Sequence, residues 1–177
     1  MRMLSVVVGL SVLLPMSASA APTSKNTAQV QLRAHYENVA RALRNRDSKA
    51  AMVGYAEDVL VFDIPPPLQV VGKQLNTAAY DHIFAQTIGP YLVDFADLRI
   101  RLLGPSAAFA TSVFKTKFKM RSGDGVSFTA RITDIFEKRN GHWLVVHEHV
   151  SLPVNMKTGT ADMNATASGK YSPFERH

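Results

Sequence analysis

The spacing of apolar residues changes along this chain and divides it into a helical first part and a strand-rich second part. Between Thr27 and Arg46 apolar residues recur every three or four positions, which predicts an amphipathic helix. A second, shorter helix is expected over residues 48–55, with Asp47 as its N-cap. A third helix is expected from Gly72 to the Gly89-Pro90 pair.

After Pro90 the spacing of apolar residues becomes two, which is typical of β-strands. Turn sequences interrupt the pattern at Gly104-Pro105, at residues 122–125 and at Arg139-Asn140-Gly141. We therefore expect an antiparallel meander after three helices. The predicted fold class is α+β, with three N-terminal helices packed on a curved, mostly antiparallel sheet that encloses a cavity at its open end.

The stretch from Tyr55 to Gly72 carries the main candidate for chemistry. Its centre alternates in the manner of a strand, which places Asp63 near the strand end on the same face as Val59 and Val61. Three consecutive prolines, 65–67, then end the ladder. Burial would raise the pKa of such a carboxyl group and make Asp63 a candidate general base. The alternative is a structural Asp that caps the proline loop.

Residues 1–20 have the pattern of a secretory signal peptide. Arg2 precedes the apolar run from Leu4 to Leu14, and Ala18-Ser19-Ala20 forms a cleavage site. The run is too short to span a bilayer, and no later segment is long enough, so we expect no membrane contact after cleavage and a periplasmic or secreted protein. Residues 21–153 would form one domain, and residues 154–177 a flexible C-terminal tail.

Composition narrows the possible partners. The formal charge is +6, and the chain contains no cysteine, which excludes disulfides and thiol chemistry. Four basic residues alternate along one strand, but no aromatic residues lie between them on that face as nucleic-acid binding would require; they are Lys115, Lys117, Lys119 and Arg121. We therefore expect a solvated face and no nucleic-acid partner.

The last predicted hairpin can form in two registers, and they present opposite faces to the interior. A two-residue Asn140-Gly141 turn would pair Asp134 with His147, whereas a three-residue loop with Gly141 as a bulge would place Asp134 with Glu148 on one face. We favour the second. His147 and His149 would then lie on the convex face. Because a third ligand is missing nearby, we expect neither a metal site nor a cofactor.

Two blocks of the sequence resemble a large superfamily. Residues 55–72, YAEDVLVFDIPPPLQVVG, resemble the motif of ketosteroid isomerases, and residues 131–153, RITDIFEKRNGHWLVVHEHVSLP, resemble the closing hairpin of the association domain of calmodulin-dependent kinase. The likeness covers roughly residues 27–153 and identifies a SnoaL-like, nuclear transport factor 2-like domain. It implies a cystatin-like cone of helices and sheet around a pocket.

The resemblance also implies roles for particular residues. Asp63 falls where ketosteroid isomerases keep their catalytic base. The oxyanion-hole Tyr of those enzymes aligns with Val39, with Tyr36 one turn earlier. Their oxyanion-hole Asp aligns with Thr133, with Asp134 beside it. Since neither donor matches in place, we do not expect steroid isomerisation.

The expected function is that of a secreted pocket protein for a small apolar or carbonyl-bearing ligand. Asp63 would act in proton transfer, as in an isomerase, cyclase or hydrolase. The expected ligand-binding residues are Tyr36, Tyr80, Thr133, Asp134 and Glu148. The alternative is a non-catalytic, dimeric binding or assembly module, and a homodimer is expected in either case.

Overall fold

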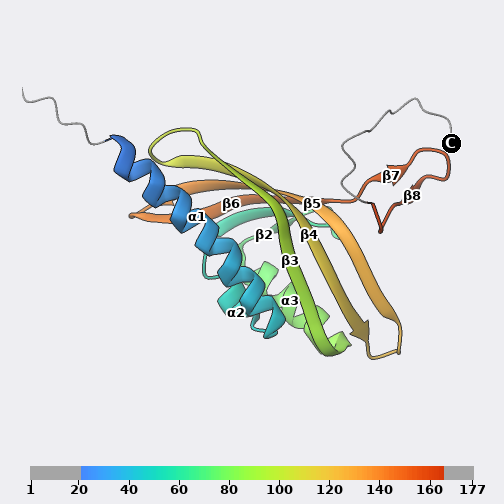
Figure 1. Ribbon diagram of the computed structural model, residues 1–177. Coiled ribbons are helices and arrows are strands. Elements are labelled where there is room, and N and C mark those ends of the chain that lie inside the picture. The colour runs from blue at the N-terminus through green and yellow to red at the C-terminus, as the bar shows by residue number, and fades with distance from the viewer. Residues whose placement is uncertain (1–20, 166–177) are drawn as a thin grey trace, which may run out of the picture.

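The computed structural model describes residues 21–165, which form a long helix, two shorter helices and a curved sheet (Figure 1). The long helix α1 spans Ala21–Arg44, α2 spans Ser48–Ala51 and α3 spans Lys73–Gln86. The predicted signal peptide lies outside the described residues. Within the described part, no helix is both long and apolar enough to cross a membrane.

Six strands form the main sheet in the order β2-β1-β6-β5-β4-β3. All neighbouring strands are antiparallel except β1 and β6, which run parallel. The predicted α+β fold is therefore confirmed. The strands are β1 (Tyr55–Phe62), β2 (Val70–Val71), β3 (Thr87–Leu102), β4 (Ala107–Met120), β5 (Gly125–Arg139) and β6 (His142–Ser151).

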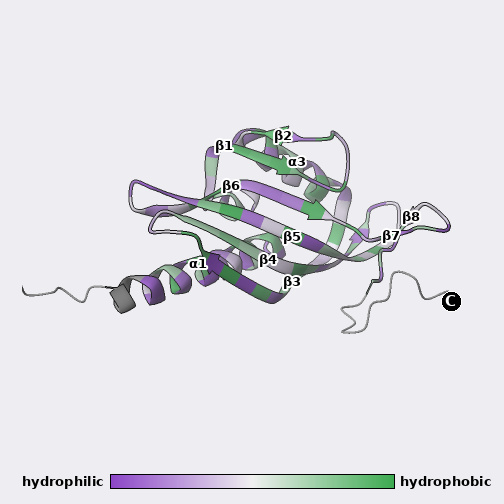
Figure 2. Ribbon diagram, turned by 90° about the horizontal axis from the view of Figure 1, so that it is seen from above, coloured by the Kyte–Doolittle hydropathy of each residue, from purple (hydrophilic) through white to green (hydrophobic). Residues whose placement is uncertain are grey.

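The helices pack on one face of this sheet, and the apolar core lies between the two layers. Helix α1 crosses the sheet beside β3 (Figure 1). Its stripe residues Leu32, Tyr36, Val39 and Leu43 are all buried in the core. Figure 2 shows the alternation of apolar and polar residues along the strands that the sequence indicated. The three- to four-residue spacing in α1 and the two-residue spacing in the strands therefore place apolar residues on the inner faces, as predicted.

Of two sequence signals at helix ends, the structure confirms one and contradicts the other. Asp47 caps α2, because its Oδ1 accepts a hydrogen bond of 2.9 Å from the backbone N–H of Ala50. The Gly89-Pro90 pair does not end α3, which stops at Gln86. Both residues lie inside β3, where a proline is tolerated because β3 is the edge strand and its register is irregular there.

The hairpin between β5 and β6 combines the two alternatives that the sequence left open. Arg139 pairs with His142, so the turn has two residues, Asn140 and Gly141, both with positive φ. A β-bulge then leaves Val146 without a pairing partner and shifts the register by one. The favoured three-residue loop is therefore wrong, but the faces it implied are those observed.

Beyond the domain, the expected flexible tail contains a second small sheet. Strands β7 (Val154–Asn155) and β8 (Thr160–Ala161) pair with each other. The backbone N–H of Thr129 donates to the carbonyl of Met163, which ties this hairpin to β5. Residues 166–177 of the expected tail lie outside the described residues.

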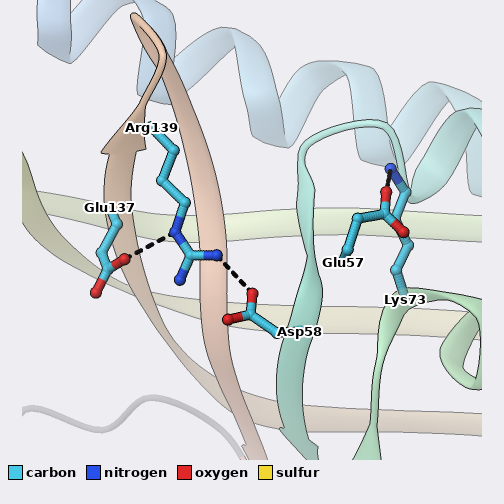
Figure 3. A network of polar contacts seen from close by, with 5 residues as sticks. All are labelled: Glu57, Asp58, Lys73, Glu137 and Arg139. Atoms are coloured by element: carbon cyan, nitrogen blue, oxygen red, sulfur yellow. Dashed lines mark hydrogen bonds and ion pairs between the residues drawn. The ribbon is translucent and has the colours of Figure 1, made fainter.

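Exposed ion pairs join three parts of the surface (Figure 3). Arg139, at the end of β5, contacts Asp58 on β1 at 2.5 Å and Glu137 at 2.9 Å. Lys73, at the start of α3, contacts Glu57 on β1 at 3.1 Å. The hydrogen bond from Arg139 lowers the pKa of Asp58. These carboxyl groups point to solvent, so they do not belong to the interior cluster described next.

Candidate active site

Two acidic residues face each other inside the domain on neighbouring strands. Asp134 of β5 pairs in register with Glu148 of β6, and the two are only 2% and 6% exposed. The Tyr36 hydroxyl of α1 donates to Oδ2 of Asp134, and the Tyr55 hydroxyl of β1 donates to Oε2 of Glu148 at 2.6 Å. Each carboxyl group thus accepts a hydrogen bond from a different tyrosine, and the two tyrosines lie on different elements.

This pair binds protons more tightly than exposed carboxyl groups do. Burial raises the pKa of Asp134 to about 7, although its hydrogen bonds to Tyr36 and Glu148 act in the opposite direction. Burial, and then the charge of Asp134, raise the pKa of Glu148 well above its usual range. Both carboxyl groups therefore keep their protons to a higher pH than exposed carboxyl groups do.

Asp63 follows β1 directly and lies at the solvent side of the same region. Its Oδ1 accepts a hydrogen bond of 2.7 Å from the N–H of Ile64, so it does cap the start of the proline loop. Water reaches Asp63, and yet the surrounding protein desolvates its carboxyl group and raises its pKa. Asp63 is thus an exposed residue whose carboxyl group is partly desolvated by its neighbours.

Two tyrosines connect Asp63 with the buried pair. Tyr80 of α3 interacts electrostatically with Asp63, Asp134 and Glu148, and Tyr91 of β3 interacts with Asp63. Exposure falls from Asp63, which is exposed, through Tyr80, which is partly buried, to the buried Glu148 and Asp134. Asp63 is therefore the carboxyl group of this set that solvent reaches.

The structure brings five of the six expected site residues together, namely Tyr36, Asp63, Tyr80, Asp134 and Glu148. Thr133 is excluded from this group. It is exposed and pairs with His149 on the other face of the sheet, because neighbouring residues of a strand point to opposite sides. Asp134, the next residue, lies on the inner face and is bonded to Tyr36.

Sequence reasoning missed three aromatic residues of this region. They are Tyr55, which opens the strand that ends before Asp63, Tyr91 and His35. The His35 ring packs against Tyr55 and Phe136, and burial lowers the pKa of His35 to about 4, so it is neutral. Tyr55 could have been found from the sequence, because it is an even number of positions from Asp63 and strand alternation places both on one face.

The two histidines of β6 lie on the sheet face opposite the helices. His147 makes a hydrogen bond of 2.9 Å to the carbonyl oxygen of Leu60, and Phe62 contacts the rings of both His147 and His149. Within residues 21–165, no three His, Asp or Glu side chains are grouped so that they could hold a metal ion. The histidines therefore have structural contacts on that outer face.

Two surface hollows occur elsewhere on the domain. One of about 420 Å³ lies between α1, α2 and Trp143, and one of about 410 Å³ lies beside β3 and the turn between β4 and β5. Neither is lined by Asp63, Asp134 or Glu148. The groups with raised pKa values therefore lie apart from both hollows.

A family comparison agrees with the fold. Residues 32–155 match the model of the SnoaL-like domain, so the chain belongs to this family. No curated protein matches the chain.

Solved structures with the same fold include proteins of different kinds. An NTF2-like protein of unknown function from Pseudomonas putida is 27% identical, with a TM-score of 0.71 over 80% of this chain and 97% of that one. A hexachlorocyclohexane dehydrochlorinase of type 2 is 10% identical, with a TM-score of 0.67 over 74% and 88%. The calmodulin-dependent kinase II association domain of C. elegans is 17% identical, with a TM-score of 0.57 over 73% and 98%. The predicted superfamily is thus confirmed, and these likenesses establish the fold.

Proposed function

We propose that the protein binds a small molecule beside the interior acid cluster and that Asp63 accepts a proton from it. The observation that carries this proposal is the position of Asp63. It is reached by solvent, its pKa is raised by desolvation, and it interacts electrostatically with Tyr80 and Glu148 farther inside. A base with a raised pKa at the entrance of an acid-lined interior suits proton abstraction from carbon or from water.

Related folds support a reaction of this kind. One similar structure is named a dehydrochlorinase, and removal of hydrogen chloride requires loss of a proton from carbon. The resemblance of residues 55–72 to ketosteroid isomerases points to the same step. The proposed activity is therefore an isomerisation or elimination that begins with proton transfer to Asp63.

Deuterium exchange tests this step without knowledge of the product. The protein is incubated in D₂O with a panel of small ketones, both neutral and amine-bearing, and deuterium next to the carbonyl group is measured by NMR. We expect faster exchange for at least one ketone, and a loss of about 10²-fold or more in Asp63→Asn. Asp94→Asn, which removes an exposed carboxyl group on β3, is the control. Equal exchange by wild type and Asp63→Asn would exclude Asp63 as the base.

A second candidate function is a non-catalytic assembly module. On the sheet face away from the helices, Ile135 is 40% exposed and lies beside Phe62, His147 and His149. An association domain is among the similar structures. We propose a homodimer through this face. Light scattering should give a dimer mass for wild type and a monomer mass for Ile135→Lys, with Ile88→Lys as control; a monomeric wild type contradicts it.

We further propose export from the cytoplasm, because residues 1–20 have the signal-peptide pattern. Expression in a Gram-negative host followed by N-terminal sequencing of the periplasmic fraction tests this. We expect a mature chain that starts at or near Ala21, and an uncleaved cytoplasmic chain would contradict it.

A further inference from the structure

The second surface hollow, of about 410 Å³, lies where the edge strand β3 begins. The end of β4 and the turn between β4 and β5 complete its walls, and these segments lie together at one end of the sheet (Figure 1). The hollow opens on the outer face of the sheet, because the Lys117 and Lys119 side chains that line it alternate with Phe118, which is buried in the core. It is therefore separate from the interior acid cluster.

A bulge in β3 shapes this hollow. The register shifts between Ile88 and Leu92, so that three residues of β3 stand opposite one residue of β4. Such a bulge bends the edge strand and disrupts its pairing with the neighbouring strand. Arg46 holds the bulged segment, because its guanidinium donates to the carbonyl oxygens of Thr87 and Gly89 at 3.0 and 2.6 Å. The shape of the hollow therefore rests on a backbone feature that side-chain hydrogen bonds keep in place.

The surface of the hollow is largely apolar. Ile88 is 36% exposed and Leu92 is 53% exposed, on either side of the bulge, and Pro90 is exposed between them. Gly123 and Gly125 contribute no side chain to the opposite wall, and a Cβ at either position would meet no atom within 4 Å. Apolar side chains in such a concave site gain stability when an apolar group covers them. The hollow therefore has room for an apolar group.

Two positive charges border this apolar surface. Lys117 and Lys119 are both exposed and line the hollow, and neither takes part in an ion pair with another described residue. No Asp or Glu of the described chain lines the hollow. The carboxylate of Asp124 in the adjacent turn is bonded to a serine hydroxyl. Lys115, the next lysine of this strand face, instead stands opposite Asp94 of β3. The hollow therefore combines apolar surface with positive charge that no acidic residue offsets.

We propose that this hollow binds a soluble amphipathic anion, a carboxylate carried on an apolar chain or ring. The apolar part would cover Ile88 and Leu92 and remove their exposed surface from water. Lys117 and Lys119 are two positions apart on one strand, so their Cα atoms lie roughly 7 Å apart and both flexible side chains can reach one carboxylate. A neutral molecule would leave both ammonium groups without a partner, and a cation would be repelled by them. This second site is independent of the proposed proton transfer.

Calorimetric titration with three probes of equal chain length and different charge tests the proposal. The probes are octanoate, octanol and octylammonium, each titrated at pH 7 below the concentration at which it aggregates. We expect octanoate to bind about ten-fold or more tightly than octanol, and octylammonium not to bind. Octanoate binding should weaken when the salt concentration rises from about 0.05 M to about 0.5 M, because salt screens exposed ammonium groups. The amide resonances of Leu92 and Gly125 should shift in NMR spectra of the protein with octanoate.

Lysine variants test the charged part of the site. The double variant Lys117→Gln with Lys119→Gln should weaken octanoate binding about ten-fold or more and leave octanol binding unchanged. Lys115→Gln is the matched control, since Lys115 is exposed on the same face of β4 and does not line the hollow. It should weaken octanoate binding by no more than about two-fold, because its charge is screened from the site. Equal effects of the double variant and the control would overturn the proposal.

Glycine variants test the apolar part. Gly125 pairs with Lys119, so a side chain at position 125 would lie on the same face and enter the hollow. Gly125→Leu should abolish octanoate binding and leave the circular dichroism spectrum unchanged, because a Cβ there meets no atom within 4 Å. Gly104→Leu, at another open position, is the control. Octanol binding as tightly as octanoate would overturn the proposal, and so would octanoate binding that Gly125→Leu leaves intact. Binding of anionic lipid vesicles without binding of octanoate would overturn it in favour of a membrane surface.

Discussion

Tyr36 and Asp134 are 98 positions apart in the sequence, and the hydroxyl of the first donates a hydrogen bond to the buried carboxyl group of the second. The contact joins α1 to β5 and fixes the inner face of the sheet relative to the helix. It also orients the acid pair, because Asp134 has one oxygen on Tyr36 and the other on the side of Glu148. A polar contact therefore connects the fold directly with the candidate active site.

Replacement of Tyr36 by phenylalanine should destabilise the domain. The variant would leave Oδ2 of a buried carboxyl group without its donor, at a cost of about 1–3 kcal/mol in the free energy of unfolding. Tyr80→Phe is the matched control, because the Tyr80 hydroxyl makes no hydrogen bond within the described residues, and its stability should change little. Urea denaturation of both variants measures the difference, and equal stabilities would contradict the role of the Tyr36–Asp134 bond.

Glu148→Gln should change how stability depends on pH. The folded-state pKa of Glu148 is raised, so the native protein keeps a proton that the unfolded chain releases above its ordinary pKa of 4.5. The contribution of this carboxyl is thus fully present below pH 4.5 and is lost as pH rises towards the folded-state pKa. The variant lacks this loss, so its stability relative to wild type should increase as the pH rises above 4.5.

His35 gives the stability the opposite pH dependence, and its effect cancels when Glu148→Gln is compared with wild type. Its pKa is lowered to about 4, so stability from this group rises with pH up to its unfolded value of 6.5. Because His35 is present in both proteins, its contribution cancels in the difference. Urea titrations at several pH values give that difference, and a value independent of pH would show that Glu148 is ionised in the folded protein.

Gly54→Ala should destabilise the domain through a steric clash. A Cβ at this position would lie 2.3 Å from Nδ1 and 2.8 Å from Cε1 of the His35 ring, which is packed against Tyr36, Tyr55 and Phe136. We expect a loss of about 1–3 kcal/mol. Gly104→Ala is the control, since a Cβ there meets no atom within 4 Å. Thermal denaturation should lower the Tm of the first variant only, and an unchanged Tm would contradict the packing of His35.

Arg46→Gln should loosen the junction between α3 and β3. The guanidinium of Arg46 donates to the carbonyl oxygens of Phe84, Thr87 and Gly89 at 3.1, 3.0 and 2.6 Å. Loss of these bonds should cost about 1–3 kcal/mol and speed amide hydrogen exchange near Thr87. Arg41→Gln, an exposed position on α1, should remain within about 0.5 kcal/mol of wild type. Exchange that is uniformly faster across the domain would instead indicate global destabilisation.

Much of the fold was predictable because it depends on local patterns. The spacing of apolar residues identified α1 and all four long strands of the meander, and Asp47 marked the start of α2. The Gly89-Pro90 pair was a wrong signal for the end of α3, because a proline is tolerated in a strand that has no neighbour on that side. Whether a strand lies at the edge depends on the order of strands in the whole sheet and cannot be inferred from the local sequence.

The site was only partly predictable for a similar reason. Asp63 could be identified from alternation and from the resemblance, whereas the choice of Tyr36 over Val39 depends on how α1 is rotated against β5. The pairing of Asp134 with Glu148 depends on the unpaired Val146. Both are consequences of long-range packing, and counting positions from a motif gives no information about it.

The bulge at Val146 keeps Asp134 opposite Glu148 in a hairpin whose two-residue turn would otherwise pair Asp134 with His147. Deletion of Val146 would preserve the acid pair, because His147 would then follow Val145 directly and still lie opposite Ile135. A change of partner would require Val146 to enter the ladder opposite Ile135, which would bring an imidazole opposite the aspartate. The acidity of the interior therefore depends on one residue that stays outside the ladder.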